Sequence, residues 1–496
     1  MPKSWNSSYK ISKSSIVRVK SEDDIVNAVL KAIDQKSRVR AMGSLYTFAN
    51  IVSPTKSKSG KDVVLDMQEY RRLVAVDKKN CTITVEGGMK IHELIHHLEN
   101  NGLSLSNYGN VTGQSVAGVI STGTHGESVK YGSFSSQVKS LRFVNGYGKI
   151  VEADFTSQEP KMVHLCNAIG VSVGMLGIIT QVTLQCEKLF YLRKSEYSVS
   201  YDELMAVWDK LHAQADYVEV TYFPIVDRFT IGVASRLVDD AGRKSFEALR
   251  PKVKRNPPNM VDGGNIAGVY LLSMLSSMID QYTWGRKILT RVFKRLKKLQ
   301  PDEHKQRFYA SIAADVIADK SNVNVKHKEF EVVVPFESSK QVIEKLHEFY
   351  QNNPQYITMY PVDFRASKKE RFYLSGTHSG DGLWIDFIIP IASVHSFPRK
   401  ELHELFKPFG ARRHWGKLSQ LEGGEAVQLY GKDLSLFLDA RKTHDPLGLF
   451  RNKELDKILH VDDGLFHAHL PDEFPTNDEN FSNSTLAAES TSSDDK

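Results

Sequence analysis

Three glycine-rich segments between Arg38 and Cys186 constrain this chain more than any other feature of its sequence. They read RVRAMGSLYTFANIV (38–52), NVTGQSVAGVISTGTHGESVKYGS (110–133) and VSVGMLGIITQVTLQC (171–186). Glycine lets a backbone approach a ligand closely and adopt positive φ, and successive N–H groups in such turns form nests that bind phosphate oxygens. One such segment alone is most simply a structural turn, but three together favour a large phosphate-bearing ligand.

The first two segments fit neither of two common nucleotide-binding motifs. Neither reads G-x-G-x-x-G after a strand, and neither reads G-x-x-x-x-G-K-[ST]. The surrounding sequence predicts short strands that alternate with helices. Ser21 and Asp24 form a capping pair before one helix, and Asn101-Gly102 ends another. The predicted strands are 15–19, 37–43, 62–66, 73–77 and 82–88. Such alternation is typical of α/β or α+β domains.

Length and charge set broad limits on the chain. Its 496 residues are too many for one core, so two or more domains are expected. A net charge of +6, from 65 basic and 59 acidic side chains, does not indicate nucleic-acid binding. The three cysteines are few and widely spaced, which favours a reducing compartment. The opening residues MPKSWNSSYK show no secretory signal, so we expect a cytoplasmic protein.

The order of the glycine-rich segments resembles the vanillyl-alcohol-oxidase superfamily of FAD proteins, in its aldonolactone and alditol oxidase branch. The first loop of that superfamily commonly reads R-x-x-G-x-x-H-S, and Arg40, Gly43 and Thr47 stand in register with it. VAGVISTGTHG and VGMLGIITQVTL are similar to its second and third loops. RRHWGK (412–417) and DARKTHDPLGLFRN (439–452) resemble the closing motifs of L-gulonolactone and D-arabinonolactone oxidases.

The resemblance implies an α+β fold. A two-part FAD-binding domain of the vanillyl-alcohol-oxidase type would be joined to an α+β substrate (cap) domain. We predict that residues 1–187 form the first part of the FAD-binding domain and 188–412 the cap domain. Residues 413–470 would return to the FAD-binding domain, and 471–496 would form a disordered acidic tail.

The resemblance also implies which residues bind FAD and how. In many members of the branch, the position of Tyr46 holds a histidine that bonds covalently to the flavin. Tyr46 cannot form that histidyl bond, so we expect non-covalent FAD. The cofactor-binding residues implied are Met42, Gly43, Ser44, Leu45, Tyr46, Thr47, Ser115, Gly118, Thr122, Gly123, Thr124, His125, Gly126, Gly174, Gly177, Ile178 and Ile179.

Four residues are predicted to be catalytic. Lys417 of HWGK is the candidate cation near flavin N1 or on the substrate hydroxyl. Asp363 and Arg365 take the Glu and Arg positions of the branch's P-x-E-x-R strand, and alternate strand residues face the same side. Aspartate is one methylene shorter than glutamate, so its carboxylate recedes. Asp386 stands near where aldonolactone oxidases often carry a histidine, and a buried aspartate needs a partner.

The resemblance implies an FAD-dependent oxidase or dehydrogenase, D-arabinono-1,4-lactone oxidase-like. It would oxidise a CH–OH group of a sugar-derived lactone or polyol by hydride transfer to flavin N5. Oxygen, a quinone or a cytochrome would be the electron acceptor. One alternative resembles decaprenylphosphoryl-ribose oxidases, which place a tyrosine at the position of Tyr46 and act on a lipid-linked sugar. The departures at 46, 363 and 386 leave a non-catalytic flavin-binding scaffold as another alternative.

Three further patterns are interpreted structurally. HELIH (92–96) matches the zinc-peptidase motif H-E-x-x-H but lacks its extension, because Glu99 stands at the glycine position. We therefore expect a helix packed on a sheet and no metal. His460, His467 and His469 are expected in a solvated segment. The basic amphipathic stretch GRKILTRVFKRLKKLQ (285–300) is expected to pack on the second domain, with docking on an anionic membrane surface as the alternative.

Overall fold

The computed structural model describes most of the residues of the chain. They are 2–11, 16–237, 307–312, 327–358, 360–390, 397–418 and 423–459, with the single positions 284, 288, 291 and 314. The predictions for most of 285–300, for the three histidines between 460 and 469 and for the tail lie outside them. No helix among the described residues is both long and apolar enough to cross a membrane.

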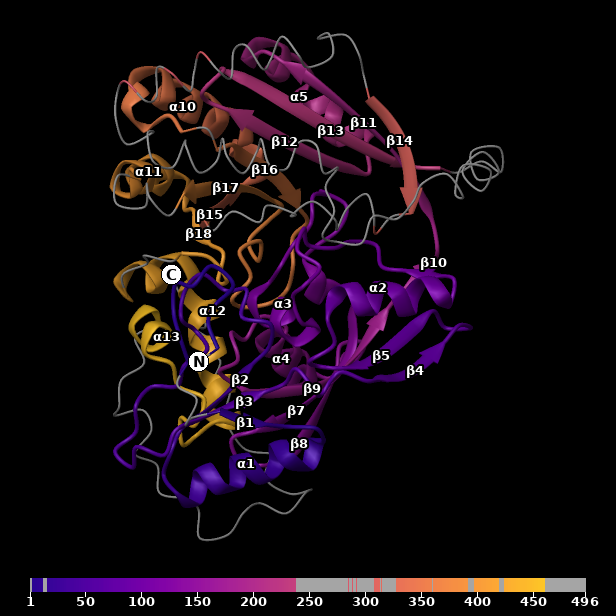
Figure 1. Ribbon diagram of the computed structural model, residues 1–496, viewed down its shortest axis with the longest axis vertical. Coiled ribbons are helices and arrows are strands. Elements are labelled where there is room, and N and C mark those ends of the chain that lie inside the picture. Colours follow the sequence, from indigo (N-terminus) through magenta and orange to yellow (C-terminus); the bar gives the residue numbers. More distant parts are fainter. Residues whose placement is uncertain are drawn as a thin grey trace, which may run out of the picture.

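The lower half of the molecule contains a parallel and an antiparallel sheet with the helices α1 to α4 (Figure 1). A parallel sheet has the strand order β1-β3-β2, and an antiparallel sheet has the order β4-β5-β9-β7-β8. The strands are β1 (Ile16–Arg18), β2 (Val39–Met42), β3 (Val63–Asp66), β4 (Leu73–Asp77), β5 (Thr82–Glu86), β7 (Val138–Asn145), β8 (Ile150–Asp154) and β9 (Gly177–Gln185). The helices are α1 (Glu22–Asp34), α2 (Ile91–Asn100), α3 (Val116–Thr122) and α4 (Pro160–Ile169). The short strands β6 (Leu103–Ser104) and β10 (Glu187–Lys188) pair with each other.

The predicted helix ends are confirmed. Ser21 accepts a hydrogen bond from the backbone N–H of Asp24, and Asp24 accepts one from the backbone N–H of Ser21, which completes a capping box. Helix α2 ends at Asn100, and Gly102 adopts a φ of +70°. The five predicted strands correspond to β1 through β5 within two residues at each end.

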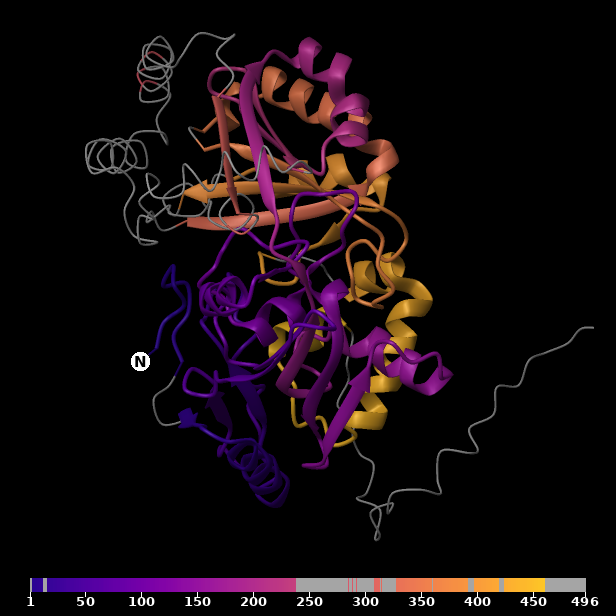
Figure 2. The ribbon, with the colours of Figure 1, turned by 90° about the vertical axis from the view of Figure 1, so that its right-hand side faces the viewer.

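An eight-stranded antiparallel sheet forms the upper half (Figures 1 and 2). Its strand order is β14-β11-β13-β12-β16-β17-β15-β18. The strands are β11 (Tyr191–Val199), β12 (Tyr217–Phe223), β13 (Arg228–Arg236), β14 (Arg307–Ile312), β15 (His327–Pro335), β16 (Val362–Ser367), β17 (Gly382–Pro390) and β18 (Arg412–Arg413). Helices α5 (Tyr201–Gln214), α10 (Ser339–Asn352) and α11 (Arg399–Phe406) cover one face of this sheet.

The two faces of the upper sheet have opposite chemistry because side chains alternate along each strand. Val332 of β15, Phe364 of β16 and Ile385 of β17 belong to the hydrophobic core beneath the helices. Charged residues that alternate with them, such as Glu331, Arg365 and Asp386, turn to the other face. Glu331, Asp386 and Asp363 are direct cross-strand neighbours on β15, β17 and β16. Their register places three carboxylates in one row.

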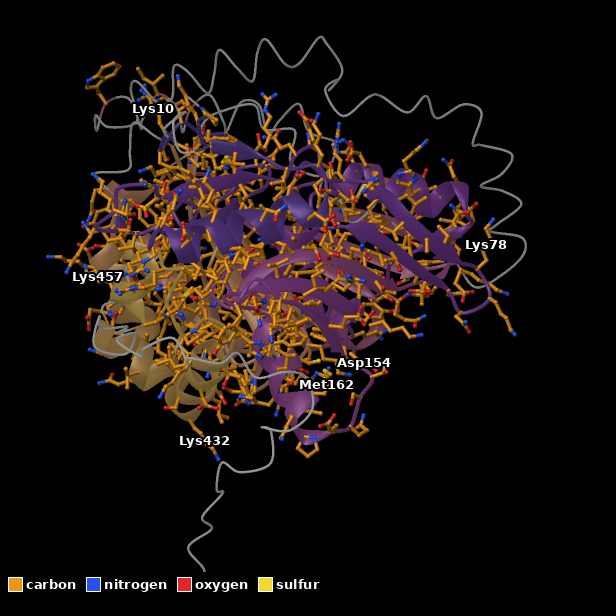
Figure 3. All side chains as sticks on the ribbon, turned by 90° about the horizontal axis from the view of Figure 1, so that it is seen from below. Lys10, Lys78, Asp154, Met162, Lys432 and Lys457 are labelled. Atoms are coloured by element: carbon orange, nitrogen blue, oxygen red, sulfur yellow. The ribbon has the colours of Figure 1, made fainter. Side chains whose placement is uncertain are left out.

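The chain returns to the lower half after β18. Helix α12 (Gly423–His444) packs against α4, and α13 (Lys453–Ile458) follows it. Both lie beside the lower sheets in Figure 1. Seen from below, Lys10, Lys78, Lys432 and Lys457 extend outward from the periphery (Figure 3) and are exposed, which is the usual position of lysine.

Candidate active site

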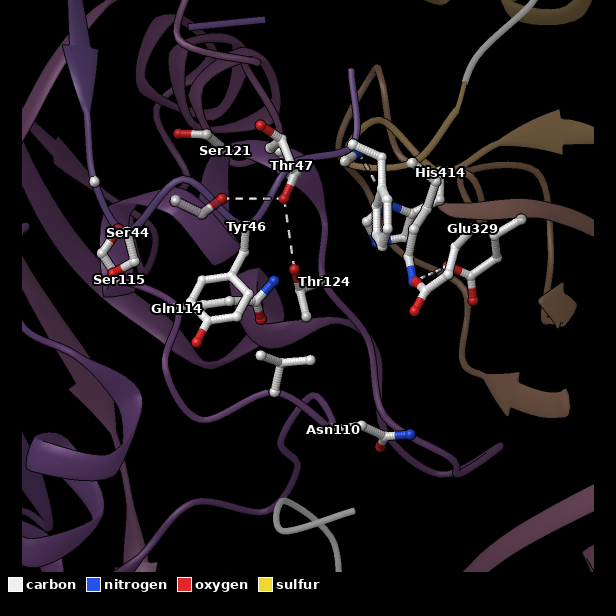
Figure 4. A pocket seen from close by; sticks show the side chains of 18 of the residues that line it. Ser44, Tyr46, Thr47, Asn110, Gln114, Ser115, Ser121, Thr124, Glu329 and His414 are labelled. Atoms are coloured by element: carbon white, nitrogen blue, oxygen red, sulfur yellow. Dashed lines mark hydrogen bonds and ion pairs between the residues drawn. The ribbon is translucent and has the colours of Figure 1, made fainter. Parts of the chain in front are cut away.

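A cavity of about 820 Å³ lies between the lower half and the charged face of the upper sheet. All three glycine-rich segments contribute to one wall, which we call the loop wall. The strands β11, β12, β15, β16 and β17, with the HWGK turn, contribute to the other, which we call the sheet wall. Figure 4 shows Ser44, Tyr46, Gln114 and Thr124 on the loop side and Glu329 on the sheet side.

The loop wall is shaped by close backbone approach. A Cβ atom at Gly43 would lie 2.2 Å from Ser115 Oγ, so glycine lets the first two segments meet there without displacing that hydroxyl. In the third segment, Val173 and Gly174 adopt consecutive φ values of +46° and +68°. A valine in this conformation is strained, and such outliers persist where the surroundings over-determine them. The wall therefore presents backbone and small polar side chains to the cavity.

Arg40, the arginine of the first motif, holds the loop wall together from behind. Its guanidinium donates to the carbonyl oxygens of Val173 at 2.7 Å, Gly174 at 3.1 Å and Phe450 at 2.6 Å. It is 5% exposed. These bonds join strand β2 to the third glycine-rich segment and to the returning end of the chain. Arg40 thus acts as a structural anchor behind the loops.

Tyr46 points into the cavity (Figure 4). Its ring stacks on Trp5 with centroids 6.3 Å apart, and a Cβ atom at Gly113 would lie 2.2 Å from its hydroxyl. Burial raises the pKa of Tyr46, so the phenol stays protonated at neutral pH. Tyr46 therefore presents a neutral phenol to the cavity from the loop wall.

Most of the predicted cofactor-binding residues line the cavity, and three do not: Met42, Gly123 and Gly126. Met42 points from β2 into a small hydrophobic cluster. Gly123 ends helix α3 in the left-handed conformation, and Gly126 packs against Asn107, whose Oδ1 would lie 1.9 Å from an added Cβ. The structure gives these three residues packing and turn-forming positions beside the cavity.

The sheet wall brings all four predicted catalytic residues to the same cavity. Lys417 Nζ lies 3.0 Å from Asp386 Oδ2 and forms an ion pair with Glu329. Arg365 Nη2 lies 2.7 Å from Glu331 Oε1 and 3.3 Å from Asp386 Oδ2. Asp386 therefore has the partners that its burial requires. Burial and the neighbouring charge of Glu331 raise the pKa of Asp386 well above its usual range.

Burial and charge act in opposite directions on Lys417. Burial lowers the pKa of its ammonium to about 7. The carboxylates of Glu329 and Asp386 favour the charged form. The lysine is therefore expected to lose its proton at or above neutral pH.

Glu331 contacts several charged side chains of the sheet wall, and it was not predicted from the sequence to be a site residue. It is fully buried, and its carboxylate contacts Arg365 as well as His125 Nε2 at 3.2 Å. Burial disfavours its ionised form, but Arg365, His125 and His414 together lower its pKa to about 2. Burial also lowers the pKa of both histidines, that of His414 to about 4. A permanent carboxylate thus organises this wall.

The alternation of β15 was the signal that could have identified Glu331. In HKEFEVVVP, His327, Glu329 and Glu331 occupy every second position of a strand whose Phe330 and Val332 join the core. Charged residues at that period in a buried strand indicate a face turned toward a polar cavity. The other lining residues that were not predicted include Trp5, Lys194, Glu196, Glu219, Thr221, His327 and His414.

The residues present fit a bound dinucleotide and a hydroxyl-bearing substrate. The loop wall offers the close backbone approach that phosphate binding requires. On the sheet wall, Glu331 Oε2 forms an ion pair with Lys417 Nζ at 3.6 Å, whereas Asp386 Oδ1 is a buried acceptor without a hydrogen-bond partner among the described residues. Buried polar atoms are rarely left unpaired, so Asp386 Oδ1 indicates a donor that a ligand supplies.

Two arrangements invite a metal interpretation. His125, Glu331 and His414 place ligand atoms within 4.8 Å of one another, but Arg365 already contacts Glu331 and disfavours a second cation there. In the HELIH helix, His92 Nδ1 lies 3.1 Å from the carbonyl oxygen of Thr112, and Glu93 pairs with Arg71. We assign no metal to either arrangement.

The fold and the cavity define an FAD-dependent oxidoreductase. Residues 14–154 match the FAD binding domain family, and this range contains the first two of the three glycine-rich segments of the loop wall. Residues 182–458 match the family described as D-arabinono-1,4-lactone oxidase, and the chain belongs to that family. These matches confirm the family, the cofactor and the α+β fold class predicted from the sequence.

The relatives of known activity include oxidases and a dehydrogenase. L-gulonolactone oxidase of Mus musculus is 24% identical, covering 92% of this chain and 97% of the mouse protein. L-gulono-1,4-lactone dehydrogenase of Mycobacterium tuberculosis is 26% identical, with 92% and 98% covered. Among solved structures, cholesterol oxidase from B. sterolicum superposes with a TM-score of 0.70 at 15% identity, covering 92% and 96%, and shows the same fold.

Proposed function

We propose that this protein oxidises a CH–OH group of a sugar-derived lactone or polyol and holds its FAD non-covalently. The observation that carries the proposal is the cluster of Lys417, Arg365 and Asp386 across the cavity from the loop wall. The family match and the names of the relatives support a lactone as the substrate. Tyr46 supports a non-covalent flavin because a tyrosine cannot form the histidyl link.

The two electrons of the reaction leave with the hydrogen on carbon. FAD, when bound, supplies the acceptor for that hydride. The hydroxyl proton of the same carbon is taken up by Asp386, whose Oδ1 faces no other donor among the described residues. The carbon–oxygen bond becomes a carbonyl, so two electrons and two hydrogens leave the substrate. A carboxylate with a raised pKa is the stronger base that such a step requires.

Arg365 and Lys417 stabilise the negative charge that develops as the proton leaves. Arg365 is held by Glu331 and Asp386, so its guanidinium is fixed before the substrate arrives. The ammonium of Lys417 lies against Asp386 and above the ring of Phe48, 5.4 Å from its centroid. Asp363 lines the same cavity from β16 and is placed to accept a second substrate hydroxyl.

Anaerobic bleaching of the flavin tests the proposal directly. Aldonolactones and alditols would be mixed with the purified yellow protein, and the loss of flavin absorbance would be followed by stopped flow. We expect bleaching by at least one lactone or polyol, and much slower bleaching in Asp386→Asn with FAD retained. Retention of FAD with no bleaching by any of these compounds would contradict the activity and favour a flavin-binding scaffold.

Acid precipitation tests the mode of FAD binding. A flavin that leaves with the supernatant is non-covalent, as we propose, whereas colour in the pellet would show a covalent link. The division at 187/188 and 412/413 is also our proposal. The upper sheet begins at Tyr191 of β11, after the first bound, whereas β18 (Arg412–Arg413) extends one residue beyond the second. We propose oxygen, a quinone or a cytochrome as the electron acceptor. We also propose that the protein is cytoplasmic, and that it either stays free of membranes or contacts a membrane surface through residues 285–300.

A further inference from the structure

A second charged cluster lies on the sheet wall, away from Lys417. Lys194 of β11 lies 2.9 Å from Glu196 of the same strand and 3.5 Å from Glu219 of β12. All three residues line the cavity. Lys194 is only 3% exposed, and lysine is almost never buried so deeply without a paired charge. The cavity thus has a polar end that the proposed oxidation does not use.

The strand register gives the separation between this cluster and the proposed base. Glu219 is directly opposite Arg365, and Thr221 is directly opposite Asp363, on the neighbouring strands β12 and β16. Asp386 lies one strand further, on β17. Strands are about 4.8 Å apart, so β12 lies roughly 10 Å and β11 roughly 19 Å from β17. A single lactone ring that reacts at Asp386 does not extend that far.

Gly232 of β13 leaves space for this end of the cavity. It lies between Glu196 and Glu219 in the register, and a Cβ atom there would lie 3.0 Å from Lys194 Cε. The missing side chain lets Lys194 lie across β13 toward Glu219. A larger residue would push the lysine into the cavity and fill the space beside it.

The charge of the sheet wall limits what this end can hold. Carboxylates outnumber cations on the wall: Glu196, Glu219, Glu329, Glu331, Asp363 and Asp386 face Lys194, Arg365 and Lys417. An anionic group such as a phosphate or a free carboxylate would be repelled. Hydroxyl groups both donate and accept, so they suit a cluster of one ammonium and two carboxylates.

We propose that Lys194, Glu196, Glu219 and Thr221 form a second sugar subsite, which binds an uncharged polyhydroxylated unit attached to the unit that is oxidised. The inference rests on the proposed oxidation for its orientation and deepens it by naming the substrate class. That class is a glycosylated lactone or polyol, rather than a single aldonolactone.

The test compares sorbitol, a single polyol, with lactitol, the same polyol carrying a neutral sugar. Dissociation constants would be measured by equilibrium dialysis of the anaerobic holoenzyme, and flavin bleaching would be recorded separately. We expect lactitol to bind at least tenfold more tightly than sorbitol. Thr221→Val and Lys194→Met should abolish this preference while sorbitol binding stays within twofold. Lys210→Met, an exposed lysine of α5, is the matched control.

The outcomes separate the two proposals. If lactitol binds no better than sorbitol, or if its advantage survives in Thr221→Val, Lys194→Met and Gly232→Ala alike, the second subsite is wrong. If neither compound nor any lactone bleaches the flavin, the proposed oxidation fails, and the dialysis still decides the subsite. Thr221→Val and Gly232→Ala change no charge, so they keep the test valid if Lys194→Met does not fold.

Discussion

The two walls of the cavity differ in the chemical groups that they present to a ligand. The loop wall uses backbone and small side chains, and its shape depends on positions such as Gly43 and Gly174, where a side chain would collide or strain the turn. The sheet wall uses charged side chains held by one another, with Glu331 between Arg365 and His125. The cofactor-binding wall therefore depends on short sequence motifs, whereas the positions of the proposed catalytic side chains depend on how distant strands pair.

Replacing Arg365 should have the largest effect on both stability and activity, because its guanidinium joins the carboxylates of the sheet wall. Arg365→Met removes the guanidinium that lies 2.7 Å from Glu331 and leaves Lys417 as the remaining cation beside Glu331 and Asp386. Removing one partner of a buried pair costs about 3–5 kcal/mol. We also expect flavin reduction to fall by about 10³-fold, because the charge that develops on the substrate loses a fixed donor. Urea unfolding and anaerobic bleaching would measure the two effects.

The double variant Arg365→Met with Glu331→Gln is the matched control for that experiment. It removes the uncompensated carboxylate, so it should recover part of the stability but none of the activity. A single variant whose unfolding free energy stays within 1 kcal/mol of the parent would show that the pair does not hold the wall.

Lys417→Ala should show the second largest effect. Removing a preorganised cation beside the reacting atoms slows such reactions by about 10²–10³-fold. FAD should stay bound, because the loop wall is unchanged. The ratio of flavin absorbance to protein absorbance would confirm retention, and stopped-flow bleaching would give the rate. Lys328→Ala, on β15 one residue before Glu329, serves as the control, and an equal loss there would argue against a specific role.

The pH dependence of flavin reduction should follow the two titrating groups of the sheet wall. Asp386 has a raised pKa, so its carboxylate is lost as pH falls, and the rate should fall with it. The Lys417 ammonium is lost as pH rises through its own lowered pKa, so the rate should fall again, about tenfold per unit, at or above pH 7. Lys417→Arg stays charged and should remove the alkaline limb. An alkaline limb that persists in this variant would assign it to another group.

Gly43→Ala should have the smallest effect, and it tests whether the close contact with Ser115 shapes the loop wall. The added Cβ would press on Ser115 Oγ, which can partly rotate away, so we expect about 1 kcal/mol of lost FAD affinity, roughly fivefold in Kd. The substrate-dependent rate of the fully loaded enzyme should not change. Ser115→Ala in the same chain should restore most of the affinity, and fluorescence titration of the apoprotein with FAD would measure both. Failure of the second change to restore affinity would locate the strain elsewhere.

The contrast between the walls also explains what the sequence could predict. The positions of the glycines predicted the loop wall, because a close contact between two backbone segments requires glycine at the point of contact. The two-residue period of a strand placed Asp363 and Arg365 on one face. It could not place Glu331 beside them, since that needs β15 to pair with β17 in a register that joins residue 331 to residue 386. Lys194 depends on still more distant pairings across β13 and β12.

Residues 2–11 lie against both walls, and this has a consequence for how the protein is made. The Trp5 backbone N–H donates to the carbonyl oxygen of Leu45, whereas Asn6 Nδ2 donates to that of His327, 321 positions later. A ribosome adds roughly 5–20 residues per second, so this segment waits about 15–60 s for its second partner to be synthesised. The cavity is therefore completed late in synthesis, and cofactor capture is expected to follow release of the chain.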